Sequence, residues 1–238
     1  MLAALVQTYN ELIAPLLLKG GAVVGVLLVL SIVALAVILI KIAQFYKAGI
    51  YASQRNRAQL LDPVLQLIRN GKYAEAQGLL EKQRGPLARM LEGGLLASWQ
   101  NHRRANEVEE EIGRIGGNQL VAMQSYFRWL EVIGNIAPLL GLLGTVMGMI
   151  TAFQQLELAG SKVNPSILAG GIWEALLTTQ VGLMVAIPVV TVLNLLESRL
   201  DQYRQIMRDV SARLMSALYA GEQKADPRPD PSSAIAAQ

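Results

Sequence analysis

One carboxylate beside an uncharged stretch of this sequence is the first candidate for chemistry. Glu174 follows Trp173 and directly precedes the uncharged run 175–196. A carboxylate at membrane depth is costly and usually faces a helix-bundle interior or a water-filled path, where it can accept and release protons. Alternatively, Glu174 marks the outer membrane interface, where tryptophan is enriched. The run after it is long enough to span a bilayer by itself, so both interpretations stay open.

Three threonine hydroxyls could extend a proton path from Glu174. Thr178 and Thr179 follow it by four and five residues, which places them one turn further along a helix. At about 100° per residue, Thr178 lies about 40° around the helix from Glu174 and Thr179 about 140°. Thr145 belongs to a second apolar stretch. Hydroxyls in membrane spans commonly bond a preceding carbonyl or join helices, so for an isolated threonine we favour that role over a proton relay.

Chemistry of other kinds has little support. The chain contains no cysteine and a single histidine, which excludes a thiolate site and a histidine cluster. It has no P-loop, dinucleotide-binding glycine pattern or nucleophile elbow. Gly141, Gly144 and Gly148 superficially resemble a glycine-rich loop, but they lie in a charge-free span, where such spacing lets helices pack closely. We therefore expect no catalytic residue, no metal and no cofactor.

Three segments are apolar and long enough to position these side chains within a membrane. A hydrocarbon core of about 30 Å needs about 20 apolar residues in a helix. Uncharged runs cover 20–40, 132–156 and 175–196, and Asn164-Pro165-Ser166 is a good start for the helix that contains the third run. Charged residues make up only 16% of the chain, against about 25% in soluble domains. The sequence therefore predicts an all-α integral membrane protein with three transmembrane helices.

The positive charges predict the orientation of these helices. Of the 21 Lys and Arg residues, only Lys19 and Lys162 precede the first run or lie between the second and third. Because basic residues collect on the cytoplasmic side, we expect the N-terminus and the loop 157–165 outside. The segment 41–128 and the C-terminus are then cytoplasmic. The same bias explains the sequence pI near 9.2 without nucleic acid.

The remaining segments also have helical patterns. Residues 1–19 predict either a short helix in the outer interface or an extension of the first span, and Pro15 with Gly20-Gly21 favours a break. Asp62-Pro63 predicts the start of a helix and Asn70-Gly71 its end. The helical stretch 106–124 is expected to run into the second span, where Gly116-Gly117 could bend it.

In chain order, the expected organisation combines these spans with long cytoplasmic helical extensions. It consists of an interfacial amphipathic segment 1–19, a transmembrane helix 20–40, a cytoplasmic helical domain 41–128, a transmembrane helix 132–156, a periplasmic loop 157–165, a transmembrane helix 166–196, a cytoplasmic helix 197–220 and a disordered tail 221–238.

Two apolar motifs resemble the signatures of a known family. Gly-Leu-Leu-Gly-Thr-Val-Met-Gly-Met (141–149) is similar to the second-span signature of the MotA/TolQ/ExbB family. Gly-Ile-Trp-Glu-Ala-Leu-Leu-Thr-Thr-Gln-Val-Gly-Leu-Met-Val-Ala-Ile-Pro (171–188) is similar to its third-span signature. Their order and the short loop between them also match. The three-span topology with an outer N-terminus resembles ExbB and TolQ rather than the four-span flagellar stator subunits.

The resemblance implies an ion-translocating, energy-transducing motor subunit, not an enzyme. Members form homopentamers around a pore in the bacterial inner membrane, surrounded by lipid. A single-span ExbD-like or TolR-like partner places an essential aspartate in that pore. Glu174 matches the family's pore carboxylate, and Thr145 and Thr179 match its polar pore-lining residues. Trp173 and the polar run 178–180 depart from many members, which leaves open which threonine matters more.

Three functions compete at this stage. The first choice is an ExbB-like subunit that powers TonB-dependent import of siderophores and cobalamin. The second is a TolQ-like subunit that acts through TolA on envelope integrity. A function of another class is a passive membrane scaffold that anchors a soluble complex. The scaffold predicts that Glu174 and Thr179 can be replaced by Gln and Val without loss of function.

Overall fold

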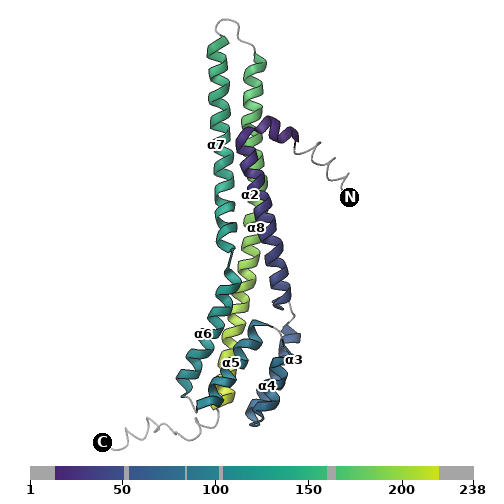
Figure 1. Ribbon diagram of the computed structural model, residues 1–238, viewed down its shortest axis with the longest axis vertical. Coiled ribbons are helices and arrows are strands. Elements are labelled where there is room, and N and C mark those ends of the chain that lie inside the picture. The colour runs from purple at the N-terminus through teal and green to yellow at the C-terminus, as the bar shows by residue number, and fades with distance from the viewer. Residues whose placement is uncertain (1–13, 51–53, 84, 102–103, 160–164, 220–238) are drawn as a thin grey trace, which may run out of the picture. The chain divides into compact units, whose positions relative to one another are not determined.

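The computed structural model describes residues 14–50, 54–83, 85–101, 104–159 and 165–219 (Figure 1). Within these ranges the regular secondary structure is entirely α-helical, which confirms the all-α fold class. The helices are α2 (Ala14–Lys47), α3 (Gln54–Arg69), α4 (Tyr73–Glu81), α5 (Pro86–Asn101), α6 (Ala105–Gln124), α7 (Phe127–Ala159) and α8 (Pro165–Tyr219). Most of the expected interfacial segment 1–19 and all of the expected tail 221–238 lie outside the described residues.

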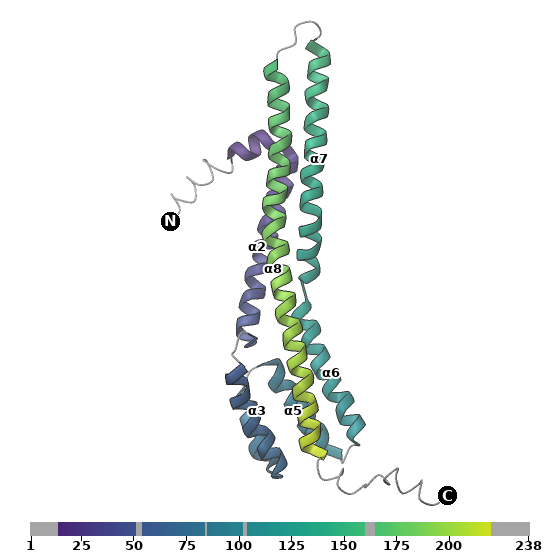
Figure 2. The same cartoon turned by 180° about the vertical axis from the view of Figure 1, so that it is seen from behind.

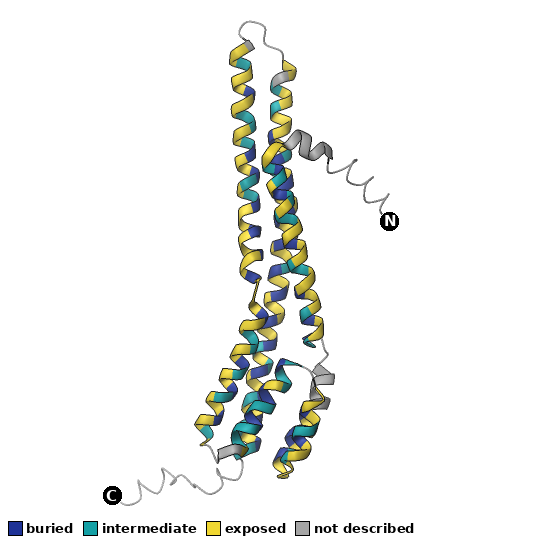
Figure 3. Ribbon diagram, viewed as in Figure 1, coloured by how far each residue is buried: buried dark blue, intermediate teal, exposed yellow. Residues whose placement is uncertain are grey.

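Three helical stretches are long and apolar enough to cross a membrane, as predicted. They lie within Gly21–Lys47, Ala105–Leu158 and Leu168–Tyr219. Large apolar side chains are exposed along all three, among them Ile32, Leu139 and Met184, each more than 60% exposed. Figure 3 shows this exposed surface along the full length of α7. An apolar surface of this extent fits contact with lipid or with other protein, and not with water.

The chain divides into two compact units, each built from segments that are distant in sequence. The apolar unit comprises Met1–Ile42 and Tyr126–Glu197, and the polar unit comprises Ala43–Ser125 and Ser198–Gln238. Helix α8 contributes to both units because it runs without interruption from Pro165 to Tyr219. The expected helix 197–220 is therefore the direct continuation of the third span.

In the apolar unit, α7 and α8 lie side by side, and α2 lies along α8 (Figures 1 and 2). Helix α2 is interrupted near its start, since Gly21 has φ 60° and ψ −161°. This region of backbone space is essentially restricted to glycine. The break that Gly20-Gly21 predicted is thus found at Gly21.

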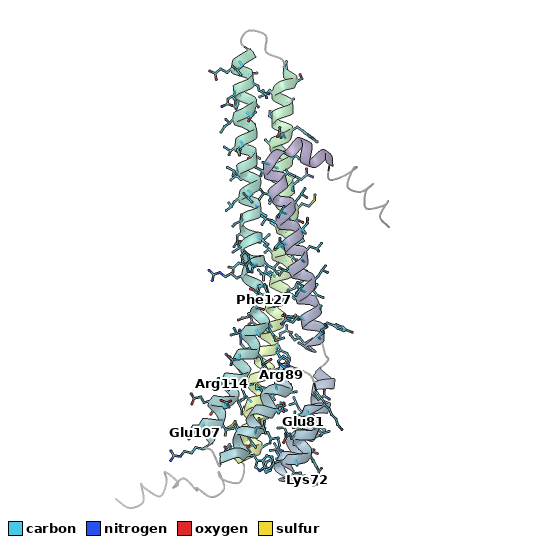
Figure 4. All side chains as sticks on the ribbon, viewed as in Figure 1. Lys72, Glu81, Arg89, Glu107, Arg114 and Phe127 are labelled. Atoms are coloured by element: carbon cyan, nitrogen blue, oxygen red, sulfur yellow. The ribbon has the colours of Figure 1, made fainter. Side chains whose placement is uncertain are left out.

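The polar unit has its own apolar core between α5, α6 and the last part of α8. Met90 and Leu95 of α5, Ile112 of α6, and Met207 and Leu214 of α8 are all buried. Figure 4 marks Arg114 and Glu107 on α6, projecting away from the ribbon. Ion pairs such as those of Arg114 with Glu111 and Lys72 with Glu75 are largely exposed and contribute little to stability.

The predicted start of α3 is wrong, whereas its predicted end is right. The helix begins at Gln54, and Pro63 lies inside it. Helix interiors lose one backbone hydrogen bond at a proline, and burial of Val64 and Ile68 offsets that cost here. At the other end, Gly71 has φ 75°, and its N–H donates to the carbonyl of Ile68 at 3.0 Å. Asn70-Gly71 therefore ends the helix as expected.

The junction between α6 and α7 also differs from the prediction. The chain does not bend at Gly116-Gly117, because Gly116 packs against Met90 and Met207 inside a continuous helix. The helix ends instead at Gln124, and Tyr126 has φ 68°, an unusual conformation for a bulky residue. No glycine or proline stands at 125–126, so this break has no local sequence signal.

Candidate functional site

Helices α7 and α8 approach closely along glycines of both helices. A methyl group on Gly144 would stand 2.6 Å from Cβ of Thr178, and one on Gly148 would stand 3.3 Å from Cα of Ala175. On α8, a methyl group on Gly182 would stand 2.6 Å from the carbonyl oxygen of Ala137. The absence of side chains at these positions is therefore what lets the two backbones approach. This contact surface sets the position of the threonines.

Two threonines of α8 point at one carbonyl of α7. The hydroxyl of Thr179 donates to the Gly141 carbonyl oxygen at 3.1 Å. The hydroxyl of Thr178 lies 3.2 Å from the same oxygen and 2.7 Å from the carbonyl oxygen of Ala175 in its own helix. Thr178 is 2% exposed, whereas Thr179 is partly buried. Thr179 thus joins the two helices through a hydrogen bond, and Thr178 lies within reach of the same acceptor.

Thr145 lies one turn along α7 from this shared carbonyl. Its hydroxyl donates to the carbonyl oxygen of Leu142 at 2.6 Å, within its own helix. In α-helical geometry its backbone N–H is assigned to the Gly141 carbonyl. Thr145 is therefore linked to Thr178 and Thr179 through Gly141, although its hydroxyl makes a different bond.

Glu174 lies one turn before Thr178 on α8 and, unlike it, is exposed in the single chain. A β-carbon on Gly21 would stand 3.6 Å from its Oε1. The carboxylate thus lies near the point where α2 is broken, a proximity that was not predicted from the sequence. The break at Gly21 was visible in the sequence, but nothing in the sequence paired it with Glu174.

Comparison of the sequence with known protein families identifies the family of this chain. The sequence profile of the MotA/TolQ/ExbB proton channel family matches residues 82–209. This chain belongs to the MotA/TolQ/ExbB family. The matched region contains Gly141, Thr145, Glu174, Thr178 and Thr179, so every predicted site residue lies inside it. Helix α2, which carries Gly21, lies outside it.

Members of the family from several bacteria are similar to this chain. The ExbB-like biopolymer transport protein 1 of Synechocystis sp. is 33% identical over 83% of this chain and 75% of its own length. The biopolymer transport protein ExbB of Salmonella typhimurium is 34% identical over 48% of this chain and 41% of its own length. The Tol-Pal system protein TolQ of Haemophilus influenzae is 34% identical over 37% of this chain and 38% of its own length. The chain spans about half or less of the length of several curated relatives it matches.

The described part of this family member offers no metal centre. No group of three His, Cys, Asp or Glu residues comes together there. Every buried side-chain nitrogen and oxygen in the same part of the chain has a hydrogen-bond partner. The candidate site is therefore a set of hydrogen-bonded threonine hydroxyls and one exposed carboxylate.

A second polar feature of the apolar unit was missed by the sequence analysis. Lys41, near the end of α2, is fully buried, and its Nζ lies 5.4 Å and 5.6 Å from the ring centroids of Tyr126 and Phe127. Figure 4 marks Phe127 at the start of α7. The sequence showed Lys41 only as the charge that ends the first uncharged run. Its aromatic neighbours stand at the break between α6 and α7, where Tyr126 has φ 68°.

Proposed function

We propose that this chain is the multi-span subunit of an ExbB-type motor that uses the proton-motive force. The observation that supports the proposal most is that Glu174, Thr178 and Thr179 lie close together on α8, where Glu174 directly precedes the uncharged run 175–196. All three residues lie in the region matched to the family, to which the similar ExbB and TolQ proteins also belong. A carboxylate in an apolar span costs free energy, and such residues usually mark a functional site such as an ion pathway.

The proposed orientation follows from the distribution of positive charge. Lys41, Arg128 and Arg199 flank the apolar runs at one end, and we place this end in the cytoplasm of a bacterial inner membrane. Glu174 then lies toward the periplasmic end of α8. The polar unit would be cytoplasmic, and the loop 157–165 periplasmic.

The proposed assembly is a homopentamer with a single-span ExbD-like partner in its pore. One carboxylate per chain cannot make a gated path alone, whereas five copies around a partner aspartate can. A proton that reaches this aspartate would neutralise it and change its affinity for the ring of threonine and glutamate side chains. The partner could then rotate or shift, and its outer part would transmit the motion to TonB.

The first test is growth on a ferric siderophore as sole iron source. The Gram-negative host lacks its own ExbB and TolQ and carries this chain with its cognate partner. We expect the intact chain to restore growth, and Glu174→Gln or Thr179→Val to abolish it at equal membrane levels. Matched controls are Glu131→Gln and Thr191→Val, since Glu131 is exposed at the start of α7 and the Thr191 hydroxyl donates within its own helix.

The alternatives predict different outcomes of the same test. A TolQ-type subunit would restore resistance to detergent and colicins but not growth on the siderophore. Growth with Glu174→Gln and Thr179→Val would contradict the site assignment while leaving the motor in place. A passive scaffold would restore neither phenotype, and its function would tolerate both substitutions.

A further inference from the structure

Two side-chain hydroxyls, those of Thr178 and Thr179, lie within hydrogen-bond distance of the Gly141 carbonyl oxygen. Thr179 donates to it at 3.1 Å, and the Thr178 hydroxyl lies 3.2 Å away. A hydroxyl has one proton, and the Thr178 hydroxyl is closer to the Ala175 carbonyl, at 2.7 Å. In this state Thr179 is thus the main side-chain donor to Gly141, and Thr178 donates mainly within its own helix.

We infer that Thr178 is a positioning residue that takes over the Gly141 carbonyl whenever the Thr179 hydroxyl turns away from it. The inference rests on the proposed proton path, in which Thr179 must exchange its hydrogen-bond partner as protons pass. It assigns Thr178 to the support of the path and not to direct proton transfer.

The exchange requires no movement of the backbone or of carbon atoms. Both acceptors already lie within hydrogen-bond distance of the Thr178 oxygen, so rotation about one C–O bond redirects its proton. The Ala175 carbonyl is not left without a donor, because helical geometry assigns the N–H of Thr179 to it. Thr178 can therefore change acceptor without leaving an unpaired group.

Packing restricts the side chain of Thr178 more than that of Thr179. Thr178 is 2% exposed, and its Cβ and Cγ2 lie over Gly144, where a methyl group would stand within 2.8 Å of them. Its β-branched side chain has few alternative rotamers. Thr179 is only partly buried, so water or a partner group can reach its hydroxyl. The two adjacent threonines are thus suited to different tasks.

Losing this support should slow proton transfer without stopping it. If Thr178 is replaced by valine, release of Thr179 leaves the Gly141 carbonyl without a side-chain donor. The cost of one such hydrogen bond corresponds to a slowing of roughly two- to tenfold. Thr178→Ser keeps the hydroxyl and should retain most of the flux.

The hydrogen bonding of Gly141 can be observed separately from activity by solid-state NMR. Glycine labelled at the carbonyl carbon and leucine labelled with ¹⁵N select the Gly–Leu peptide bonds, which follow Gly78, Gly94, Gly141 and Gly182. Leu142→Ile removes the Gly141 signal and so assigns it. Gly78 and Gly94 belong to the polar unit and are internal references.

We expect the Gly141 carbonyl shift to change little in Thr178→Val and in Thr179→Val alone. In the double variant it should move clearly toward the value of a more weakly bonded carbonyl. If Thr179→Val alone gives the shift of the double variant, Thr178 does not take over and the inference is wrong. Thr191→Val, in the same helix, should leave the Gly141 signal unchanged.

Proton flux into proteoliposomes that contain the chain and its cognate partner completes the test. A two- to tenfold loss in Thr178→Val, with recovery in Thr178→Ser, supports the inference. Unchanged flux in Thr178→Val overturns it, whatever the NMR result. A wild-type complex that conducts no protons would contradict the proposed function itself, and the NMR exchange would then have no part in a proton path.

Discussion

The carboxylate of Glu174 lies against Gly21, at the point where α2 departs from helical geometry. The two residues are far apart in sequence, and only Glu174 lies within the region matched to the family. Helical residues resume after Gly21, and the first N–H groups of a helix favour a nearby negative charge. The break in the first span and the position of the carboxylate are thus structurally connected.

Replacement of Gly21 by alanine should strain the backbone beside Glu174. At φ 60° and ψ −161°, an alanine is strained by about 1–3 kcal/mol, and its methyl group would contact Glu174 Oε1. We expect a lower free energy of unfolding in detergent and a lower proton flux. Gly49→Ala is the matched control, since Gly49 also has a positive φ, 69°, and no heavy atom lies within 4 Å of its added methyl group. Equal behaviour of the two variants would show that the Gly21 contact is unimportant.

The sequence predicted the spans because their signal is local. Uncharged runs, the helix start at Pro165 and the helix end at Asn70-Gly71 depend on neighbouring residues alone. The start of α3 was missed because Asp62-Pro63, a good helix start elsewhere, is accommodated inside a longer helix. The break at Tyr126 was missed because its residue types give no turn signal.

The arrangement of the candidate site was only partly predictable. Helical geometry correctly placed Thr178 one turn from Glu174, but it could not tell which neighbour each side chain would meet. Thr178 is buried against α7, whereas Glu174 is exposed and its carboxylate lies near Gly21. The shared acceptor at Gly141 depends on the register between α7 and α8, and no spacing within one helix contains that information.

Among the glycines of α7 that face Thr178, Gly144 is predicted to tolerate substitution by alanine least. A methyl group there would stand 2.6 Å from both Cβ and Oγ1 of Thr178, which is itself fully packed. Gly144→Ala should therefore separate the helices and lower the free energy of unfolding by about 1–3 kcal/mol. Denaturation of the purified protein with SDS measures the change. A loss no larger than that of Gly113→Ala, a helical glycine whose added methyl group meets no heavy atom within 4 Å, would mean that α7 can shift without cost.

The rings beside Lys41 predict that replacing this lysine lowers the thermal stability of the protein. Its ammonium lies over the rings of Tyr126 and Phe127. Contacts of this kind contribute about 2 kcal/mol when they are desolvated, and burial of the charge opposes them. We expect Lys41→Met and Tyr126→Leu to lower thermal stability in detergent, and Tyr126→Phe to change it little. A more stable Lys41→Met variant would show that the burial cost is larger than the ring contacts.

The core of the polar unit can be tested through one glycine and the isoleucine that covers it. A methyl group on Gly94 of α5 would stand 2.6 Å from Cγ1 of Ile112 and 2.9 Å from Cδ2 of Leu214. Gly94→Ala should cost about 1–3 kcal/mol of the free energy of unfolding. Ile112→Ala alone should cost about 2–5 kcal/mol because it opens a cavity.

The double variant separates a specific clash from general damage. Ile112→Ala removes the carbon atoms nearest to the new methyl group, which in turn fills part of the cavity. The cost of Gly94→Ala with Ile112→Ala should therefore be smaller than the sum of the single costs, by about 0.5–3 kcal/mol. Gly117→Ala with Ile112→Ala should be additive, since a methyl group on Gly117 meets no atom within 4 Å. Additive costs in both pairs would mean that α5 moves away from α6 and that the close packing at Gly94 does not position the helices.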